Sequence, residues 1–259
     1  MKLMGVVNVT PDSFSDGGRY LDADAAIAHG EELARDGAEI LDIGGESTRP
    51  GAAEVDAGEE LRRTEPVVAA LAGRAAVSID TSKLAVAEAA LDAGASIVND
   101  VTALRRDPEM AALCADRGAG VVLMHMPGNP RTMQDNPSYG DVVDEIKAFL
   151  AERIEAAVAA GVEKERIWLD PGIGFGKTVE HNLELLRRLA ELRDLGRPLV
   201  IGTSRKSFIG KIDGSEVDER LGGSIASSVL AAAEGADVLR VHDVAETAQA
   251  MRVAEAILG

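Results

Sequence analysis

The sequence predicts a single-domain (β/α)₈ barrel of 259 residues. Short runs rich in Val, Ile and Leu alternate with longer stretches whose apolar residues recur every three or four positions, and eight such pairs can be counted. The connections after the short runs are longer and richer in Gly, Pro, Ser and Asn than those after the long stretches. Parallel strands joined by crossover helices are typical of this alternation, and eight strands close a barrel.

The eight predicted strands carry the branched apolar residues expected of a wall buried on both faces. They cover residues 3–9, 38–44, 75–80, 95–100, 119–125, 166–170, 198–203 and 236–242. Predicted helices include residues 22–36, 83–93, 141–160, 180–193 and 244–258. Asp22 and Asp243 stand where the first and last of these helices should begin. Glycines stand where helices should end, namely Gly37, Gly94, Gly118, Gly161, Gly196 and Gly235.

Composition limits the class of protein. No apolar run approaches the ~18 residues that a membrane span needs, and the N-terminus enters a strand pattern without the longer apolar stretch of a signal peptide. We therefore expect a cytoplasmic protein that does not bind membranes. The single cysteine, Cys114, lies in a helical pattern and is expected to be a small core residue.

The chain is strongly acidic, with a formal net charge of −17. Its overall field repels phosphate, so nucleic acids and anionic membranes are unfavourable partners. An anionic substrate therefore requires a local basic pocket.

Polar residues end the predicted strands, at the rim where barrel enzymes build active sites. In chain order they are Asn8, Asp42, Asp80, Asn99, His125, Asp170, Lys206, Arg240 and His242. One such residue alone would more often cap a helix or brace a loop. A complete set from eight strands favours one converging site.

These residues divide into two chemical groups. The acceptors of Asp80, Asn99 and Asp170 suit a planar heterocycle with several N–H donors on its edge. Arg240 and His242, with Arg49 from the loop after the second strand, suit a phosphate group. Asn8 offers a neutral oxygen that suits Mg²⁺ beside a diphosphate, although an Asx turn is the alternative interpretation. The segment 172–177, GIGFGK, lacks the spacing and the Ser/Thr of a nucleotide-binding P-loop.

Eight blocks along the chain resemble the dihydropteroate synthase family in order and spacing. They are NVTPDSFSDGG, LDIGGESTRPGA, SIDTSK, IVNDVTA, VVLMHMPGNPRTMQ, WLDPGIGFGKT, GTSRKSFIG and LRVHDV. The resemblance runs from end to end, and the first two blocks together are highly specific.

This resemblance implies that the chain joins a (7,8-dihydropterin-6-yl)methyl diphosphate to 4-aminobenzoate. It implies a pterin site of Asp80, Asn99, Val101, Met124, Asp170, Phe175 and Lys206, and a diphosphate site of Thr48, Arg49, Arg240 and His242 with Asp42 close behind. It implies that 4-aminobenzoate contacts Phe14, Pro50, Phe175, Lys206 and Ser207, and that Asn8 holds Mg²⁺. The residues it implies for catalysis are Asp16, Arg49, Asp80 and Lys206.

Two other functions remain as alternatives. A methyltetrahydrofolate-dependent methyltransferase is a related barrel that binds a pterin, but it needs no site for diphosphate. A pterin-binding protein without catalysis is expected to lose loop residues, whereas Asp16 and Arg49 are present. By resemblance we also expect a homodimer, and the uninterrupted segment STRPGA predicts sensitivity to sulfonamides.

Overall fold

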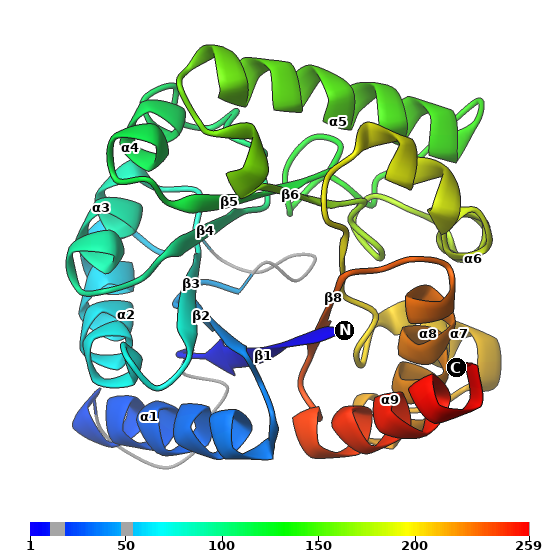
Figure 1. Cartoon of the computed structure of the whole chain (residues 1–259), viewed down its shortest axis with the longest axis horizontal. Coiled ribbons are helices and arrows are strands. Elements are labelled where there is room, and N and C mark those ends of the chain that lie inside the picture. The colour runs from blue at the N-terminus through cyan, green and yellow to red at the C-terminus, as the bar shows by residue number, and fades with distance from the viewer. Residues whose placement is uncertain (11–18, 48–53, 259) are drawn as a thin grey trace.

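The computed structural model describes residues 1–10, 19–47 and 54–258. Its strands form a ring, and the helices lie around the outside (Figure 1). The strands are β1 (Lys2–Asn8), β2 (Ile40–Gly44), β3 (Ala76–Asp80), β4 (Ile97–Asp100), β5 (Gly120–Met124), β6 (Ile167–Asp170), β7 (Val200–Ile201) and β8 (Val238–Val241). The predicted fold class is confirmed.

All paired strands are parallel, in the order β6-β5-β4-β3-β2-β1-β8-β7. The ring closes between β6 and β7 through a narrow contact, in which the Leu169 amide donates to the Pro198 carbonyl over 2.9 Å. Strand β7 is shorter than the predicted range 198–203, because only Val200 and Ile201 pair with β8.

The helices are α1 (Arg19–Asp36), α2 (Ala57–Leu71), α3 (Leu84–Asp92), α4 (Met110–Asp116), α5 (Val142–Ala159), α6 (Val179–Arg187), α7 (Ser207–Asp213), α8 (Leu221–Ala233) and α9 (Val244–Leu258). Two predicted boundaries are wrong. The first helix begins at Arg19, so Asp22 lies inside it and does not begin it. The predicted helix 180–193 is interrupted at Arg188, whose backbone (φ −113°, ψ 21°) leaves the helical region before a 3₁₀ segment at Leu189–Leu195.

Other local signals are confirmed. The six glycines predicted to end helices all have positive φ, from 59° at Gly118 to 114° at Gly37, which side chains other than glycine seldom adopt. Cys114 is fully buried, as predicted. Asp243 immediately precedes α9, where its carbonyl accepts from the Thr247 amide, while its carboxylate pairs with Arg205.

Side chains alternate in direction along each strand, and this alternation separates two apolar layers. One layer fills the barrel interior, and its members are Met4, Ile40, Ile97, Val122, Val200 and Val238, with Trp168 packed against them. A larger layer, which includes Leu41, Ile43 and Leu123, lies between the strands and the helices. Since neighbouring residues of a strand point to opposite faces, the inner layer determines which later residues also point inward.

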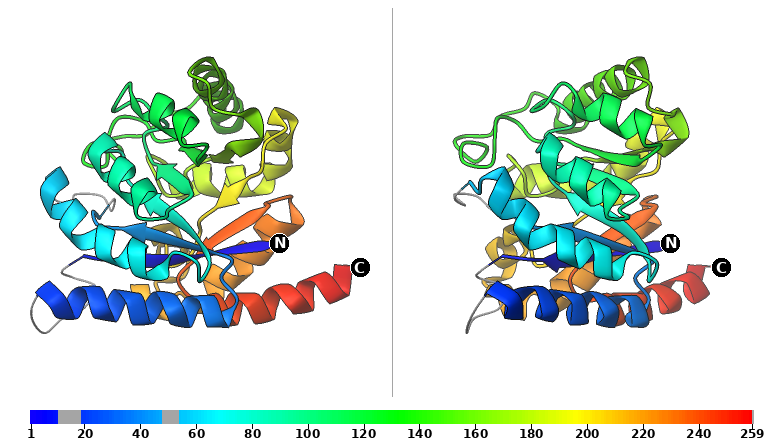
Figure 2. Two further views of the ribbon diagram at one scale, coloured as in Figure 1. Left: turned by 60° about the vertical axis from the view of Figure 1, so that its left-hand side comes forward. Right: turned by 90° about the vertical axis from the view of Figure 1, so that its left-hand side faces the viewer.

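The chain ends meet on one side of the barrel. Helices α1 and α9 pack together along that side, and both termini lie near it in Figure 2. The Met1 amino group lies 3.7 Å from the Glu255 carboxylate. No helix in the described ranges is both long and apolar enough to span a membrane.

Candidate active site

The candidate site lies at the carboxyl ends of the strands, and its inward direction follows from the inner apolar layer. The polar side chains of the rim each follow a residue of the inner layer by two positions in the same strand. Those inner-layer residues are Ile40, Ile97, Trp168 and Val238. Those side chains are Asp42, Asn99, Asp170 and Arg240. The same alternation that fills the barrel with apolar residues therefore aims polar groups at one place above them.

Arg240 links two carboxylates from different strands. Its Nε donates to Asp42 Oδ2 over 2.6 Å, and one terminal nitrogen donates to Asp80 Oδ2 over 2.8 Å. Asn99 Nδ2 also donates to Asp42 Oδ2, at 3.0 Å. Asp42, Asp80, Asn99 and Arg240 therefore form one network, which we call the central network.

The central network has more carboxylate oxygen atoms than its hydrogen-bond donors can satisfy. Within the described residues, the Oδ1 atoms of Asp42 and Asp80 are buried without a hydrogen-bond partner. Burial and the neighbouring Asp42 charge raise the pKa of Asp80 to about 7, although Arg240 opposes this shift. Buried acceptors without donors are costly, so a ligand with N–H groups would relieve them.

Asp170 and Lys206 form the other side of the site. Asp170 Oδ1 accepts from the Gly172 amide over 2.7 Å, and burial raises the pKa of its carboxyl group while Lys206 opposes the shift. Lys206 Nζ donates to the Ile173 carbonyl and lies 4.7 Å from the ring centre of Phe175. Burial lowers the pKa of Lys206 to about 8. A Cβ at Gly202 would lie 3.6 Å from Lys206 Nζ and 3.7 Å from Arg240 Cβ, so both side chains extend over this glycine.

An apolar wall completes this part of the site. Val101, Met124, Met126 and Met133 form one buried cluster, and Phe175 packs against it. The structure thus brings together the three apolar residues predicted for the pterin site, Val101, Met124 and Phe175. Met126 and Met133 extend the wall.

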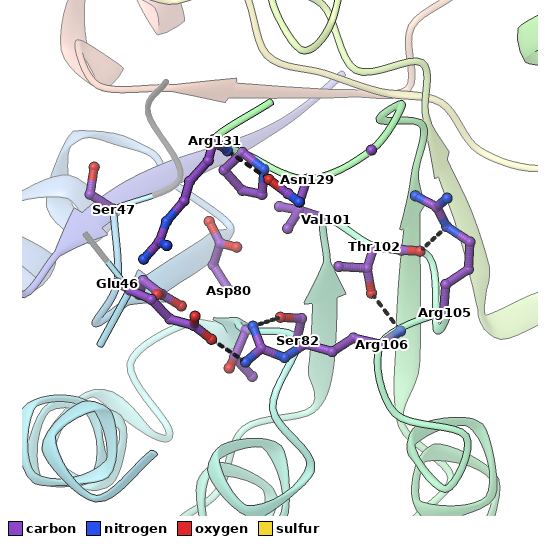
Figure 3. A pocket seen from close by; sticks show the side chains of 14 residues that line it. Glu46, Ser47, Asp80, Ser82, Val101, Thr102, Arg105, Arg106, Asn129 and Arg131 are labelled. Carbon is purple, nitrogen blue, oxygen red and sulfur yellow. Dashed lines mark hydrogen bonds and ion pairs between the residues drawn. The ribbon is translucent and has the colours of Figure 1, made fainter. Parts of the chain in front are cut away.

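A cavity of about 440 Å³ opens beside this wall, and Figure 3 shows its lining side chains around Asp80. Asp80 and Val101 belong to both the cavity and the predicted pterin site. Three arginines that sequence reasoning did not select also line the cavity, namely Arg105, Arg106 and Arg131. Arg105 donates to the Met126 carbonyl and Arg106 pairs with Glu54, so both guanidinium groups already have protein partners.

The comparisons with known proteins agree with this geometry. The pterin binding enzyme family matches residues 4–242. The dihydropteroate synthase of Escherichia coli strain K12 is 50% identical over 258 residues, which span 99% of this chain and 91% of that protein. The chain belongs to the dihydropteroate synthase family.

Solved structures of this family superpose closely. The Xanthomonas albilineans enzyme with 4-aminobenzoic acid has a TM-score of 0.94 and 50% identity, and the match covers 100% of this chain and 93% of that one. The same organism's enzyme in complex with 7,8-dihydropteroate has a TM-score of 0.91 and 48% identity, over 100% and 94% of the two chains.

Some residues implied by the family resemblance lie outside the described residues. These are Phe14, Asp16, Thr48, Arg49 and Pro50. The others are placed at the rim: His242 Nδ1 lies 3.0 Å from Ser204 Oγ, and Ser207 is the exposed first residue of α7. Ser204 was missed by sequence reasoning, although its place in the block GTSRKSFIG indicates a site residue.

The prediction that His125 belongs to the converging ring is wrong. Its ring packs edge-on against Phe149 of α5, with centroids 4.9 Å apart, and its Nδ1 lies 3.1 Å from Lys177 Nζ. Met124, the preceding residue, occupies the inward position of β5. Neighbouring residues of a strand point to opposite faces. The prediction that Met124 contacts the pterin therefore already implied that His125 points away from the site.

A second buried ionic cluster braces the connection after β2. Glu46 Oε1 accepts from the Val55 amide over 2.9 Å, and Glu46 Oε2 accepts from Lys83 Nζ over 2.6 Å. Lys83 also pairs with the fully buried Glu60. Glu46 therefore joins the two flanks of residues 48–53, which include three of the predicted site residues.

Proposed function

We propose that this chain catalyses the condensation of (7,8-dihydropterin-6-yl)methyl diphosphate with 4-aminobenzoate to give 7,8-dihydropteroate and diphosphate. The observation that supports this most directly is the central network, where buried carboxylates with unused acceptors stand beside a guanidinium group. The relatives from Xanthomonas albilineans bind 4-aminobenzoic acid and 7,8-dihydropteroate, a substrate and the product of this reaction.

The acceptors bind and orient the pterin in this proposal. Asp170, Asn99 and Asp80 receive the N–H edge of the ring, and Val101, Met124 and Phe175 contact its faces. Lys206 donates to the ring from the side of β7. The deep position of these groups excludes water from the methylene carbon that reacts.

Arg240 and His242 receive the diphosphate. As the bond from the methylene carbon to the diphosphate oxygen breaks, negative charge grows on the leaving group and positive charge spreads into the pterin ring. Arg240 stabilises the former, and the carboxylates of Asp80 and Asp170 stabilise the latter. The weakly basic nitrogen of 4-aminobenzoate then needs to be positioned more than activated, which is the role of Phe175, Lys206 and Ser207.

We infer that Asn8 contributes to a Mg²⁺ site. A Cβ at Gly44 would lie 3.9 Å from Asn8 Oδ1 and 3.8 Å from Asp80 Oδ2, so two oxygens border the space that this glycine leaves. Hard oxygen ligands of this kind fit Mg²⁺, which when bound would offset charge on the diphosphate. Turnover should stop in EDTA and return with Mg²⁺; full turnover in the chelator would contradict the assignment.

A diphosphate-release assay tests the proposed reaction. Purified protein with Mg²⁺ should release diphosphate only when both the pterin diphosphate and 4-aminobenzoate are present, and a sulfonamide should inhibit this release. Diphosphate release that does not depend on 4-aminobenzoate, or a requirement for a corrinoid methyl acceptor, would favour the methyltransferase alternative. Binding of the pterin diphosphate without any release would favour a non-catalytic protein.

We also infer that the protein is a homodimer. Of the eight large hydrophobic residues exposed within the described ranges, six lie between residues 212 and 257. They are Ile212, Val217, Leu221, Leu230, Val253 and Ile257. Exposed apolar area gathered on adjoining helices is typical of an interface. In sedimentation, Leu230→Glu should give monomers whereas Val158→Glu, at an exposed site on α5, should not.

The assignment of the protein to the cytoplasm stays a prediction.

A further inference from the structure

The turn between β6 and α6 is packed too tightly to carry side chains at its glycines. Gly172, Gly174 and Gly176 have φ values of 70°, 84° and 60°. A Cβ would lie 2.0 Å from the His125 carbonyl oxygen at Gly172 and 2.2 Å from Pro127 Cγ at Gly176. Residues 172–176 therefore lie directly against the connection that follows β5, and only glycine fits at these contacts.

Four consecutive carbonyl groups of this turn each accept a hydrogen bond from a side chain. Lys206 Nζ donates to the carbonyl of residue 173, and Gln134 Nε2 donates to that of residue 174 over 2.9 Å. Lys177 Nζ donates to the carbonyl of Phe175 over 2.9 Å, and Tyr139 Oη donates to that of residue 176 over 2.8 Å. The donors come from separate parts of the chain, so they fix the turn from several directions.

Lys177 is the most buried of these donors, with 2% of its surface exposed. Its Nζ has a second partner in His125 Nδ1, 3.1 Å away. Burial lowers the pKa of Lys177 well below its usual value, and burial together with Lys177 lowers the pKa of His125 to about 3. His125 is therefore neutral near pH 7, and its Nδ1 lone pair can accept from Lys177.

Phe175 is the side chain that this arrangement presents to the site. Its ring packs against the wall of Val101 and Met124 and faces Lys206 Nζ at 4.7 Å. Its carbonyl is held by Lys177, which is itself too buried to reach a bound substrate. The hydrogen bond to this carbonyl is the contact through which Lys177 can set the position of the Phe175 ring.

We propose that Lys177, held by His125 Nδ1, is a positioning residue that sets the ring of Phe175 against 4-aminobenzoate. This inference rests on the proposed function, in which Phe175 contacts that substrate. Burying the Lys177 amine without partners would be unfavourable, and here it has two acceptors and lies near Asp170.

Lys177→Met removes the donor while nearly preserving the side-chain length. We expect KM for 4-aminobenzoate to rise roughly tenfold, the effect of losing one buried hydrogen bond, while kcat and KM for the pterin diphosphate change less. Lys147→Met is the matched control, because Lys147 lies on α5 and pairs with exposed Asp194. It should leave both KM values unchanged.

A double-mutant cycle with Phe175→Leu separates positioning from general loosening of the fold. If Lys177 acts through the ring, Lys177→Met should raise KM for 4-aminobenzoate no further in the Phe175→Leu background. Additive effects of the two substitutions would overturn the inference. If Lys177→Met does not fold, Lys177→Gln, whose side chain is one bond shorter and so places its N–H donors farther from the Phe175 carbonyl, serves in the same cycle.

The wild-type assay separates this inference from the proposed function. Absence of turnover with both substrates would contradict the proposed function whatever Lys177 does. Normal wild-type turnover, with a Lys177→Met variant whose KM values are unchanged or with an additive cycle, would overturn only the role of Lys177.

Discussion

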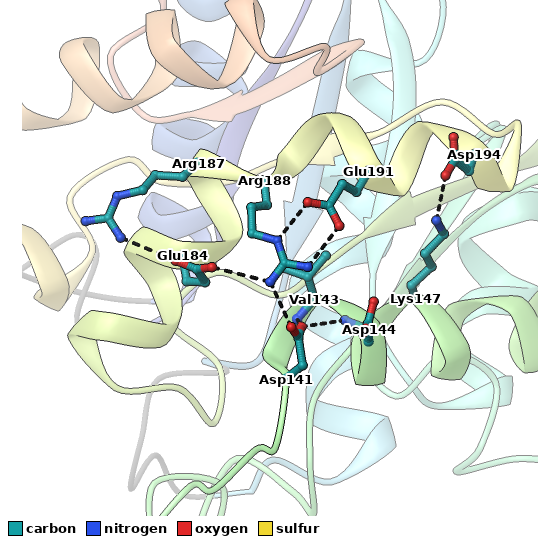
Figure 4. A network of polar contacts seen from close by, with 9 residues as sticks. All are labelled: Asp141, Val143, Asp144, Lys147, Glu184, Arg187, Arg188, Glu191 and Asp194. Carbon is teal, nitrogen blue, oxygen red and sulfur yellow. Dashed lines mark hydrogen bonds and ion pairs between the residues drawn. The ribbon is translucent and has the colours of Figure 1, made fainter.

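Arg240 and Arg188 each bind more than one carboxylate, but Arg240 lies inside the barrel and Arg188 on its outer surface. Arg188 contacts Asp141 at 2.9 Å, Glu191 at 2.7 Å and Glu184 at 3.3 Å, where α5 approaches α6 (Figure 4). All three carboxylates are exposed to water. Arg240 instead holds Asp42 and Asp80, which are buried and keep acceptors unused.

The difference shows what each network contributes. Around Arg188, solvent screens the charges and supplies hydrogen bonds to any oxygen that the arginine does not reach, so the network adds little stability. Around Arg240, two carboxylates share one cation away from solvent, which is unfavourable unless a ligand supplies further donors. The surface network joins two helices, whereas the central network keeps acceptors that the proposed ligand would satisfy.

The largest effect should follow from Arg240→Met. This substitution leaves Asp42 and Asp80 buried without their cation, so we expect the free energy of unfolding to fall by about 3–5 kcal/mol. Urea denaturation would measure this loss, and turnover should be abolished. An unchanged denaturation midpoint would mean that the two carboxylates do not depend on Arg240.

The loss should depend on pH because the pKa of Asp80 is already raised to about 7. Without Arg240 it rises further, so folded protein keeps a proton that the unfolded chain releases. The deficit relative to the wild type therefore grows as pH rises above about 7, where folded wild-type protein releases this proton and the variant does not, and it changes little below pH 7. Adding Asp80→Asn to Arg240→Met should recover much of the stability at pH 8. A deficit independent of pH would contradict this explanation.

A smaller effect is expected for Asp170→Asn, which keeps the shape but removes the charge of one acceptor. Pterin binding should weaken by roughly 1.5–3 kcal/mol, the range for charge-assisted hydrogen bonds. Isothermal titration calorimetry with the pterin measures this directly. Wild-type affinity in a folded variant would remove Asp170 from the proposed pterin site.

The smallest effect is expected for Arg188→Met. Catalytic constants should match the wild type because Arg188 lies on the outer helices, and the melting temperature should decrease slightly at low salt and less at high salt. Thermal denaturation at two salt concentrations tests this. A loss as large as that of Arg240→Met would contradict the distinction between the two networks.

The sequence by itself determined the barrel and the polar residues of its rim. Strand and helix periodicities are local, so the alternation of eight pairs could be recognised without tertiary contacts. Alternation along the strands also gives the inward direction of these residues, which lie at or near the carboxyl ends of their strands, namely Asp42, Asp80, Asn99, Asp170 and Arg240.

Only the tertiary structure decided which of these groups are partners. Arg240 meets Asp42 and Asp80 across 198 and 160 residues of sequence, and no local pattern specifies such a pairing. His125 directly follows β5, but its side chain points outward, where it packs against Phe149 of α5 and contacts Lys177. Local chemistry selects the candidates for a site, whereas the closing of the barrel determines which of them meet.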